Sequence, residues 1–120
     1  MASPEVLLVQ AFNEAFNRHD AEAMLALMTD DCVFENTVPP PDGARYVGQA
    51  EGRAFWQAFF RASPAARIAI EELVICGERG FQRWVYRWTD AAGRAGYVRG
   101  VDIFRFRDGK IAEKLSYVKG

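Results

Sequence analysis

The sequence has little of what metal and redox sites need. It holds one histidine and two cysteines, Cys32 and Cys76, which lie far apart and outside any metal-binding motif. Structural zinc and related ions are held by clustered cysteine and histidine side chains. We therefore expect no metal site and no cofactor, and we expect both cysteines to be reduced core residues of a cytoplasmic protein.

The sequence also lacks a long apolar run and an excess of either charge. Its longest apolar stretches are too short to cross a bilayer, and its first residues do not show the basic and then apolar pattern of a signal peptide. Lysine and arginine total 15 against 16 aspartate and glutamate, so the net charge is −1. Without a basic excess, nucleic-acid binding is not expected. Neither a membrane nor a nucleic acid is a predicted partner.

What is present suits one domain over residues 1–120. Half of the residues are hydrophobic and 26% are charged, a balance typical of a packed core with a solvated surface. Ser3 followed by Pro4 is typical of a helix start, and Asp20 can cap a short second helix. A strand is expected over 32–37, then a proline-rich loop of about ten residues, then a third helix over about 50–62.

The apolar period changes to two from residue 67 onward, which indicates strands. Glycine-containing turns separate four expected strands, at about 67–76, 81–90, 96–107 and 110–118. Three hairpins in succession predict an antiparallel meander. The predicted fold class is therefore α+β, with three N-terminal helices packed on a strongly curved antiparallel sheet that forms a cone with an internal cavity.

Asp102 lies in a run, 98–106, that is otherwise typical of a buried strand. A carboxylate there is hard to hydrate, so it must find a partner, reach a cavity or keep its proton. A carboxylic acid kept neutral near pH 7 could donate a hydrogen bond to a developing oxyanion. The alternative is a structural acid that neighbouring polar side chains satisfy.

Four segments together carry a resemblance to a known family: 16–20, 27–36, 46–48 and 102–111. The chain resembles the nuclear transport factor 2-like superfamily, in its SnoaL-like and ketosteroid-isomerase-like branch. The resemblance extends over nearly the whole chain and implies a single SnoaL-like, cone-shaped domain. It leaves the function open, because this fold hosts isomerases, cyclases, epoxide hydrolases, dehydratases and non-catalytic partners.

The family's isomerase site implies three positions in this sequence. It has an aspartate base on the first strand, a tyrosine on the first helix and a protonated aspartate on a later strand. These fall on Asn36, Phe12 and Asp102. Asn36 cannot take up a proton at neutral pH and Phe12 has no hydroxyl, so we expect no efficient ketosteroid isomerisation by that mechanism.

Two other activities of the fold also involve Asp102. The resemblance to limonene epoxide hydrolases implies an Asp-Arg-Asp arrangement, but strand alternation places Arg99 on the face opposite Asp102, and the second acid would fall near Ser116. SnoaL-like cyclases need one acid/base in an apolar pocket, and Asp102 is the natural candidate.

Alternating residues on two strands extend the predicted site. Trp84, Tyr86 and Trp88 share one strand face, either as core filling or as the wall of a flat pocket in which Tyr86 donates to an oxyanion. Lys114 alternates with its neighbours on the last strand and is either a snorkelling surface lysine or a partner of Asp102. In the second case Asp102 is a carboxylate and the neutral-donor hypothesis fails.

The predicted catalytic residues are Asp102 and Tyr86. The predicted ligand-binding residues are Phe12, Phe34, Asn36, Phe55, Phe59, Trp84, Trp88, Lys114 and Ser116. The first functional hypothesis is a cofactor-independent enzyme, resembling an isomerase, cyclase or hydrolase, that acts on a small hydrophobic, cyclic or carbonyl-bearing metabolite. The alternative is a non-catalytic ligand-binding or dimerising module. The resemblance also implies a homodimer formed through the outer face of the sheet.

Overall fold

The computed structural model describes residues 2–120, which form three helices and six strands. The helices are α1 (Pro4–Asn17), α2 (Ala21–Ala26) and α3 (Gly48–Ala62). The strands are β1 (Met28–Glu35), β2 (Arg45–Val47), β3 (Arg67–Cys76), β4 (Arg79–Thr89), β5 (Ala95–Arg107) and β6 (Lys110–Val118). The predicted α+β class is confirmed.

The first two helices begin where the sequence predicts. The Ser3 hydroxyl accepts a hydrogen bond from the Val6 N–H at 3.2 Å. At the start of α2, the Asp20 carboxylate accepts one from the Ala23 N–H at 3.0 Å. Both side chains satisfy N–H groups that have no partner inside the helix.

The three predicted hairpins are present. Strands β3 to β6 pair consecutively and antiparallel. The last of these turns contains Asp108 with φ 53° and Gly109 with φ 73°. A type I′ turn needs positive φ at both central residues, which Asp-Gly adopts readily. The predicted Asp-Gly hairpin between β5 and β6 is therefore confirmed.

The prediction of an entirely antiparallel sheet is wrong. The six strands lie in the order β2-β1-β6-β5-β4-β3, and β1 runs parallel to β6, so the sheet is mixed. Turn signals reveal only pairing between strands that are adjacent in sequence, whereas β1 and β6 come from opposite ends of the chain. The sequence also gave no sign of β2, which pairs antiparallel with β1. The sheet is open, with β2 and β3 as its edges.

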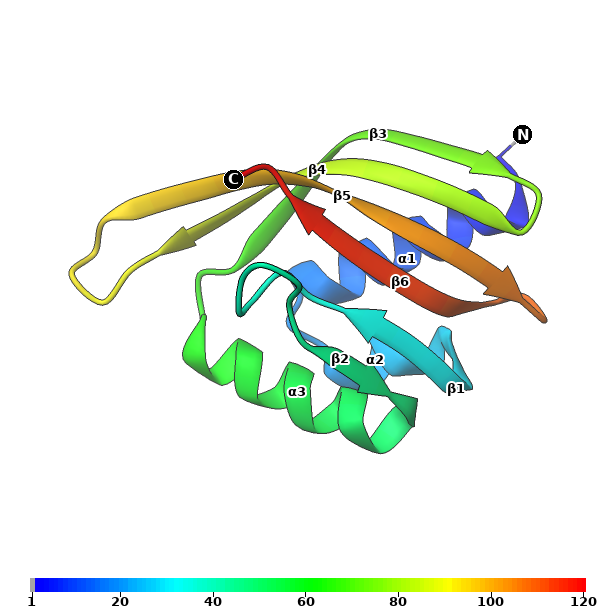
Figure 1. Ribbon diagram of the computed structural model, residues 1–120, viewed down its shortest axis with the longest axis horizontal. Helices are drawn as coiled ribbons and strands as arrows, with labels where there is room; N and C mark the ends of the chain where they lie inside the picture. The colour runs from blue at the N-terminus through cyan, green and yellow to red at the C-terminus, as the bar shows by residue number, and fades with distance from the viewer. Residues whose placement is uncertain (1) are drawn as a thin grey trace.

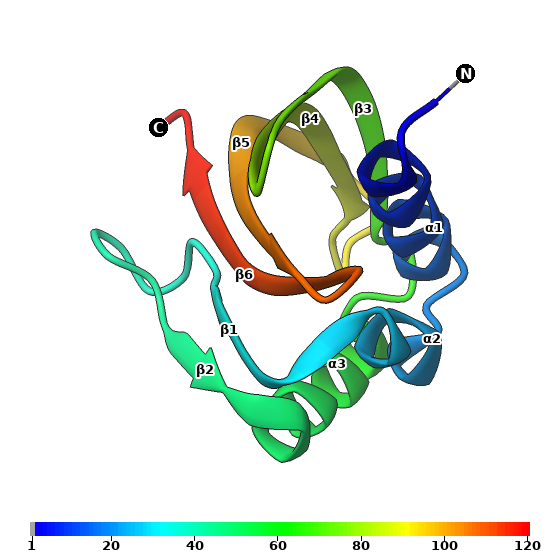
Figure 2. The same cartoon turned by 90° about the vertical axis from the view of Figure 1, so that its right-hand side faces the viewer.

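The helices lie on one side of the sheet, with α1 near β3 and α3 near β1 (Figure 1; Figure 2). Between these layers lies an apolar core that includes Phe12, Met24, Phe34 and Phe104, each at most 1% exposed. Burial of such side chains is the main driving force for folding. The helices and the sheet thereby hold the residues of the predicted site at one end of a packed core.

The two cysteines differ in their environments. Cys32 is buried in β1, as predicted, and burial raises the pKa of its thiol. Cys76 is exposed at the end of edge strand β3, so its predicted place in the core is wrong. Strand alternation directs the Cys76 side chain to the outer face of edge strand β3, where it is exposed to solvent. Within residues 2–120, no helix is long and apolar enough to span a bilayer, and no three His, Cys, Asp or Glu side chains are grouped as metal ligands.

Candidate functional site

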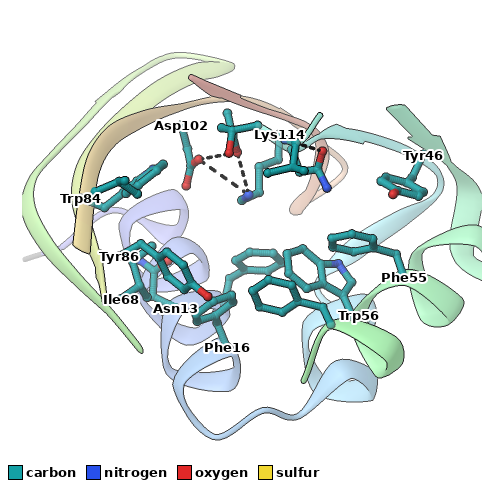
Figure 3. Close-up of a pocket in the computed structure, with 17 residues that line it drawn as sticks. Asn13, Phe16, Tyr46, Phe55, Trp56, Ile68, Trp84, Tyr86, Asp102 and Lys114 are labelled. Atoms are coloured by element: carbon teal, nitrogen blue, oxygen red, sulfur yellow. Dashed lines mark hydrogen bonds and ion pairs between the residues drawn. The ribbon is translucent and has the colours of Figure 1, made fainter. Parts of the chain in front are cut away.

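A pocket with a volume of about 440 Å³ lies between the helices and the inner face of the sheet (Figure 3). This volume is within the usual range for small-molecule sites. The predicted residues that line the pocket are Phe12, Asn36, Phe55, Phe59, Trp84, Tyr86, Asp102, Lys114 and Ser116. Most of the predicted site is therefore gathered around one pocket.

Phe34 and Trp88 were predicted to line the pocket but do not. Phe34 is 1% exposed and lies behind the wall, stacked on Trp56 at 5.3 Å and on Tyr46 at 4.9 Å between ring centroids. Trp88 stacks on Tyr86 at 5.5 Å, farther along β4. Strand alternation correctly predicted which face of the sheet each side chain is on. It does not predict how deeply a side chain is buried, or whether it lies beside the pocket or beyond it.

Asp102 lies on β5, is 1% exposed and is surrounded by hydrogen-bond donors. Its Oδ2 accepts a hydrogen bond from Gln82 Nε2 at 2.9 Å, and its Oδ1 accepts one from Ser116 Oγ at 2.7 Å. Lys114 Nζ lies 3.6 Å from the same Oδ1. Donors on both oxygens, with an ammonium beside them, suit a carboxylate. The hypothesis that Asp102 is a neutral donor therefore fails.

Lys114 faces the pocket rather than the solvent. Only 12% of its side chain is exposed, and its ammonium donates a hydrogen bond to Ser116 Oγ at 3.0 Å. The same ammonium lies 5.7 Å from the centroid of the Trp56 ring, which is within range of a cation–π interaction. The surface-lysine interpretation is wrong, and the pairing with Asp102 is confirmed.

A row of polar side chains crosses three strands and continues to α1. In the sheet register, Gln82 on β4 is opposite Asp102, which is opposite Ser116 on β6. Gln82 and Asn13 of α1 exchange two amide hydrogen bonds, at 2.7 and 3.1 Å, and both side chains are buried. Buried polar groups that are fully paired fix one arrangement of their neighbours. Gln82 and Asn13 thus hold the Asp102 carboxylate in place.

Gln82 and Asn13 were not recognised from the sequence. The available signal was the alternation of β4, which places Gln82 on the same face as Trp84 and Tyr86. Other lining residues that were not predicted as part of the site are Phe16, Thr37, Val38, Tyr46, Trp56, Ile68 and Val98.

Tyr86 contributes a phenol to the opposite side of the pocket from Asp102 (Figure 3). Its ring packs near Phe59 and Phe16, with centroids 6.2 and 6.5 Å away. Burial raises the pKa of the Tyr86 phenol, and the Ser63 side chain offsets this only in part. The phenol is therefore protonated at neutral pH and can act as a hydrogen-bond donor.

Asn36 combines a structural contact with a place in the pocket wall. Its Oδ1 accepts hydrogen bonds from the Val38 N–H at 3.3 Å and the Ala44 N–H at 2.9 Å. The side chain thereby holds both ends of the proline-rich loop that follows β1. The amide nitrogen is the part of Asn36 that can serve a ligand.

Trp56 and Trp84 have indole N–H groups without an acceptor among the described residues. Trp56 is 5% exposed and Trp84 is 6% exposed, and both line the pocket. Trp84 lies over Gly100, where a Cβ atom would come within 2.4 Å of the indole ring. Gly100 therefore allows the ring to lie against β5.

The sequence matches the family model of the SnoaL-like domain over residues 9–114. No curated protein matches the chain. Solved structures do match, and one of them is an NTF2-like protein of unknown function from Mesorhizobium loti. It is 39% identical, the alignment covers 98% of this chain and 92% of that chain, and the TM-score is 0.81.

Two further solved structures have the same fold. An NTF2-like protein of unknown function from Burkholderia pseudomallei is 25% identical, with 98% of this chain and 92% of that chain covered and a TM-score of 0.87. A protein from Mycobacterium tuberculosis, crystallised in complex with estradiol-17β-hemisuccinate, is 27% identical, with 97% and 94% covered and a TM-score of 0.82.

Proposed function

The chain belongs to the SnoaL-like domain family, as its sequence predicts, and from that premise we propose that it is a small-molecule enzyme. Its pocket binds a flat, hydrophobic ring compound with a carbonyl group and transfers a proton within it. One observation carries this proposal: the buried Asp102–Lys114 pair opens onto a pocket with aromatic walls.

The walls of the pocket favour a flat ring as ligand. Phe16, Phe59 and Tyr86 present ring faces and edges in mutual contact. Such surfaces bury a planar apolar molecule well, because offset-stacked and edge-to-face contacts add to the hydrophobic effect. The related protein from Mycobacterium tuberculosis, crystallised with estradiol-17β-hemisuccinate, supports a ligand of this class. We further propose that the helices and the sheet form the walls of a cone around this ligand.

The proposed chemistry uses the Asp102 carboxylate as a base. It removes a proton from the carbon next to the carbonyl, the C–H electron pair becomes the C=C bond of an enolate, and the carbonyl oxygen gains negative charge. The Lys114 ammonium and the protonated Tyr86 phenol stabilise that oxygen. Protonated Asp102 then returns the proton, to the same carbon or to another. This step needs no cofactor.

Exchange of α-protons with solvent tests the proposal directly. In D2O, the protein should accelerate the loss of the α-proton signals of a ring ketone such as 2-tetralone, measured by NMR. Asp102→Asn keeps the shape of the side chain and should lower the rate at least about 100-fold, the usual contribution of a general base. Asp31→Asn is the matched control, because Asp31 is an exposed carboxylate paired with Arg107, and it should leave the rate unchanged. Equal rates for Asp102→Asn and wild type would refute the base.

A non-catalytic ligand carrier is the second candidate, and one observation favours it. Asn36 and Phe12 line the pocket at the positions where the family's isomerase has its base and its phenol. A carrier would retain a ligand through purification, visible by native mass spectrometry, and would show no exchange with any ring ketone.

We also propose that two copies pair through the outer face of the sheet. On that face, Val74 and Tyr117 are apolar strand residues that are 41% and 57% exposed. Light scattering should give the mass of a dimer, and Val74→Lys should shift it to a monomer. A monomeric wild type would refute the pairing.

A further inference from the structure

The two unpartnered indole groups indicate what kind of ligand the pocket holds. Trp56 and Trp84 are both more than nine-tenths buried, and neither Nε1 has an acceptor among the described residues. Buried N–H groups in proteins nearly always have a partner, so each exception calls for an explanation. Both side chains line the same pocket, where a ligand atom can supply the missing acceptor.

The two groups come from separate walls of the pocket. Trp56 belongs to α3 and lies across the pocket from Asp102. Trp84 belongs to β4 and lies beside Asp102, on the side of the pocket away from Trp56 (Figure 3). One acceptor atom between them would have to bridge two layers of the fold. Two acceptor atoms, at different ends of a rigid ring system, fit the arrangement without such a bridge.

The remaining polar groups of the pocket are also mainly donors. The Lys114 ammonium faces the Trp56 ring, and the Tyr86 phenol is protonated. The strongest acceptor, the Asp102 carboxylate, already accepts from Gln82 and Ser116. A ligand rich in N–H or ammonium groups would therefore meet donors, whereas a ligand rich in oxygen would satisfy them.

We propose that the natural ligand is a planar ring compound with acceptor oxygens at two separated positions, bound by the indole N–H groups of Trp56 and Trp84. This rests on the proposed ligand pocket, but it does not depend on the proton-transfer step. Diones, diketones and ring compounds with both a ketone and a carboxylate are members of the class. Unsubstituted hydrocarbons and amines are not.

A graded series of probes tests this proposal. Naphthalene, 2-acetylnaphthalene and 2,6-diacetylnaphthalene share one ring system and differ in the number of carbonyl oxygens. Each carbonyl should tighten binding up to about tenfold, since a hydrogen bond to an otherwise unsatisfied buried donor is worth about that factor. The sequence contains three tryptophans, so ¹H–¹⁵N spectra should show one indole N–H signal for each.

The third tryptophan provides the matched control. Trp88 stacks on Tyr86 but does not line the pocket. On binding of the diacetyl probe, the signals of Trp56 and Trp84 should move downfield, while that of Trp88 should stay. Trp56→Phe and Trp84→Phe remove ring area as well as the N–H, so each should weaken binding of the diacetyl probe by up to about tenfold more than it weakens binding of naphthalene. Trp88→Phe should bind every probe as the wild type does.

The outcomes separate this inference from the proposed enzyme. Equal affinity for naphthalene and its diacetyl derivative, or indole signals that do not move on binding, would overturn the inference and leave the pocket and its base in place. Because the spectra of the unaltered protein suffice for the second result, a tryptophan variant that fails to fold does not obscure it. Movement of both indole signals without α-proton exchange would support the inference and overturn the catalytic step. Failure of every probe to bind would overturn both this inference and the proposed enzyme.

Discussion

Replacing Lys114 by methionine removes the positive charge from a buried pair and keeps most of the side chain's length. In the wild type, Lys114 Nζ lies 3.6 Å from Asp102 Oδ1, and the side chains are 12% and 1% exposed. In the variant, Asp102 keeps its hydrogen bonds from Gln82 and Ser116 but loses the only ammonium close to it among the described residues. Its negative charge is then buried without compensation.

The expected cost is large because the surviving partner cannot reach water. Breaking a buried ion pair by removing one member costs about 3–5 kcal/mol of unfolding free energy. An exposed pair costs far less, about 0–1 kcal/mol. The pair between Arg53 and Glu22 is the internal comparison, because its side chains are 42% and 60% exposed. Arg53→Met should therefore leave stability nearly unchanged.

Urea unfolding followed by tryptophan fluorescence measures these differences. Small proteins lose about 1–3 kcal/mol of stability per molar urea, so Lys114→Met should lower the midpoint by at least about 1 M. The double variant Lys114→Met/Asp102→Asn should recover most of this loss, since no charge then remains to be compensated. A cost for Lys114→Met no larger than that for Arg53→Met would refute the reasoning. It would mean that the folded protein does not need the Lys114 ammonium to accommodate Asp102.

The other predictions concern Tyr86 and the two cysteines. Since burial raises the pKa of Tyr86 above its ordinary value of 10.0, the unfolded chain releases this proton at lower pH than the folded protein does, and stability should fall as the pH rises above about 10. Tyr86→Phe should reduce this alkaline loss, measured as urea midpoints at pH 8 and pH 11; an equal loss in both proteins would contradict the burial of the phenol. Cys76 is exposed and Cys32 is buried with a raised pKa, so an aromatic disulfide reagent should label Cys76 at once and Cys32 only after unfolding. Rapid labelling of both would show that β1 opens readily.

Local signals in the sequence were enough to predict the elements that depend on near neighbours. The caps at Ser3 and Asp20 act within one helical turn, and the Asp-Gly turn after β5 acts within one hairpin. The parallel pairing of β1 with β6 depends on how the helices return the chain to the sheet. The hydrophobic pattern within a strand shows which of its faces is buried. It does not show whether a neighbouring strand that is distant in sequence runs parallel or antiparallel to it.

One irregularity in the pairing of β5 with β6 determines that Lys114 faces the pocket. The turn pairs Arg107 with Lys110, and an unbroken register from there would place Leu115 opposite Asp102. Lys114 and Ser116 would then face outward, away from Asp102. A register shift between Arg105 and Phe106 instead brings Ser116 opposite Asp102 and turns Lys114 inward. A bulge of this kind exchanges the two faces of a strand and leaves no mark in the alternation itself.

The pocket keeps groups that can move a proton, although it differs from the isomerase site that the family resemblance implies. By the resemblance to the family's isomerase, Asn36 and Phe12 stand where that enzyme has an acid and a phenol. The fold brings an ammonium beside Asp102, and in the same pocket two indole N–H groups have no acceptor within residues 2–120. A site with a protonated aspartate needs a separate base, whereas a carboxylate flanked by donors can be the base itself. The contacts of Asp102 favour the second arrangement, because Lys114 Nζ lies 3.6 Å from its Oδ1 and both of its oxygens accept hydrogen bonds.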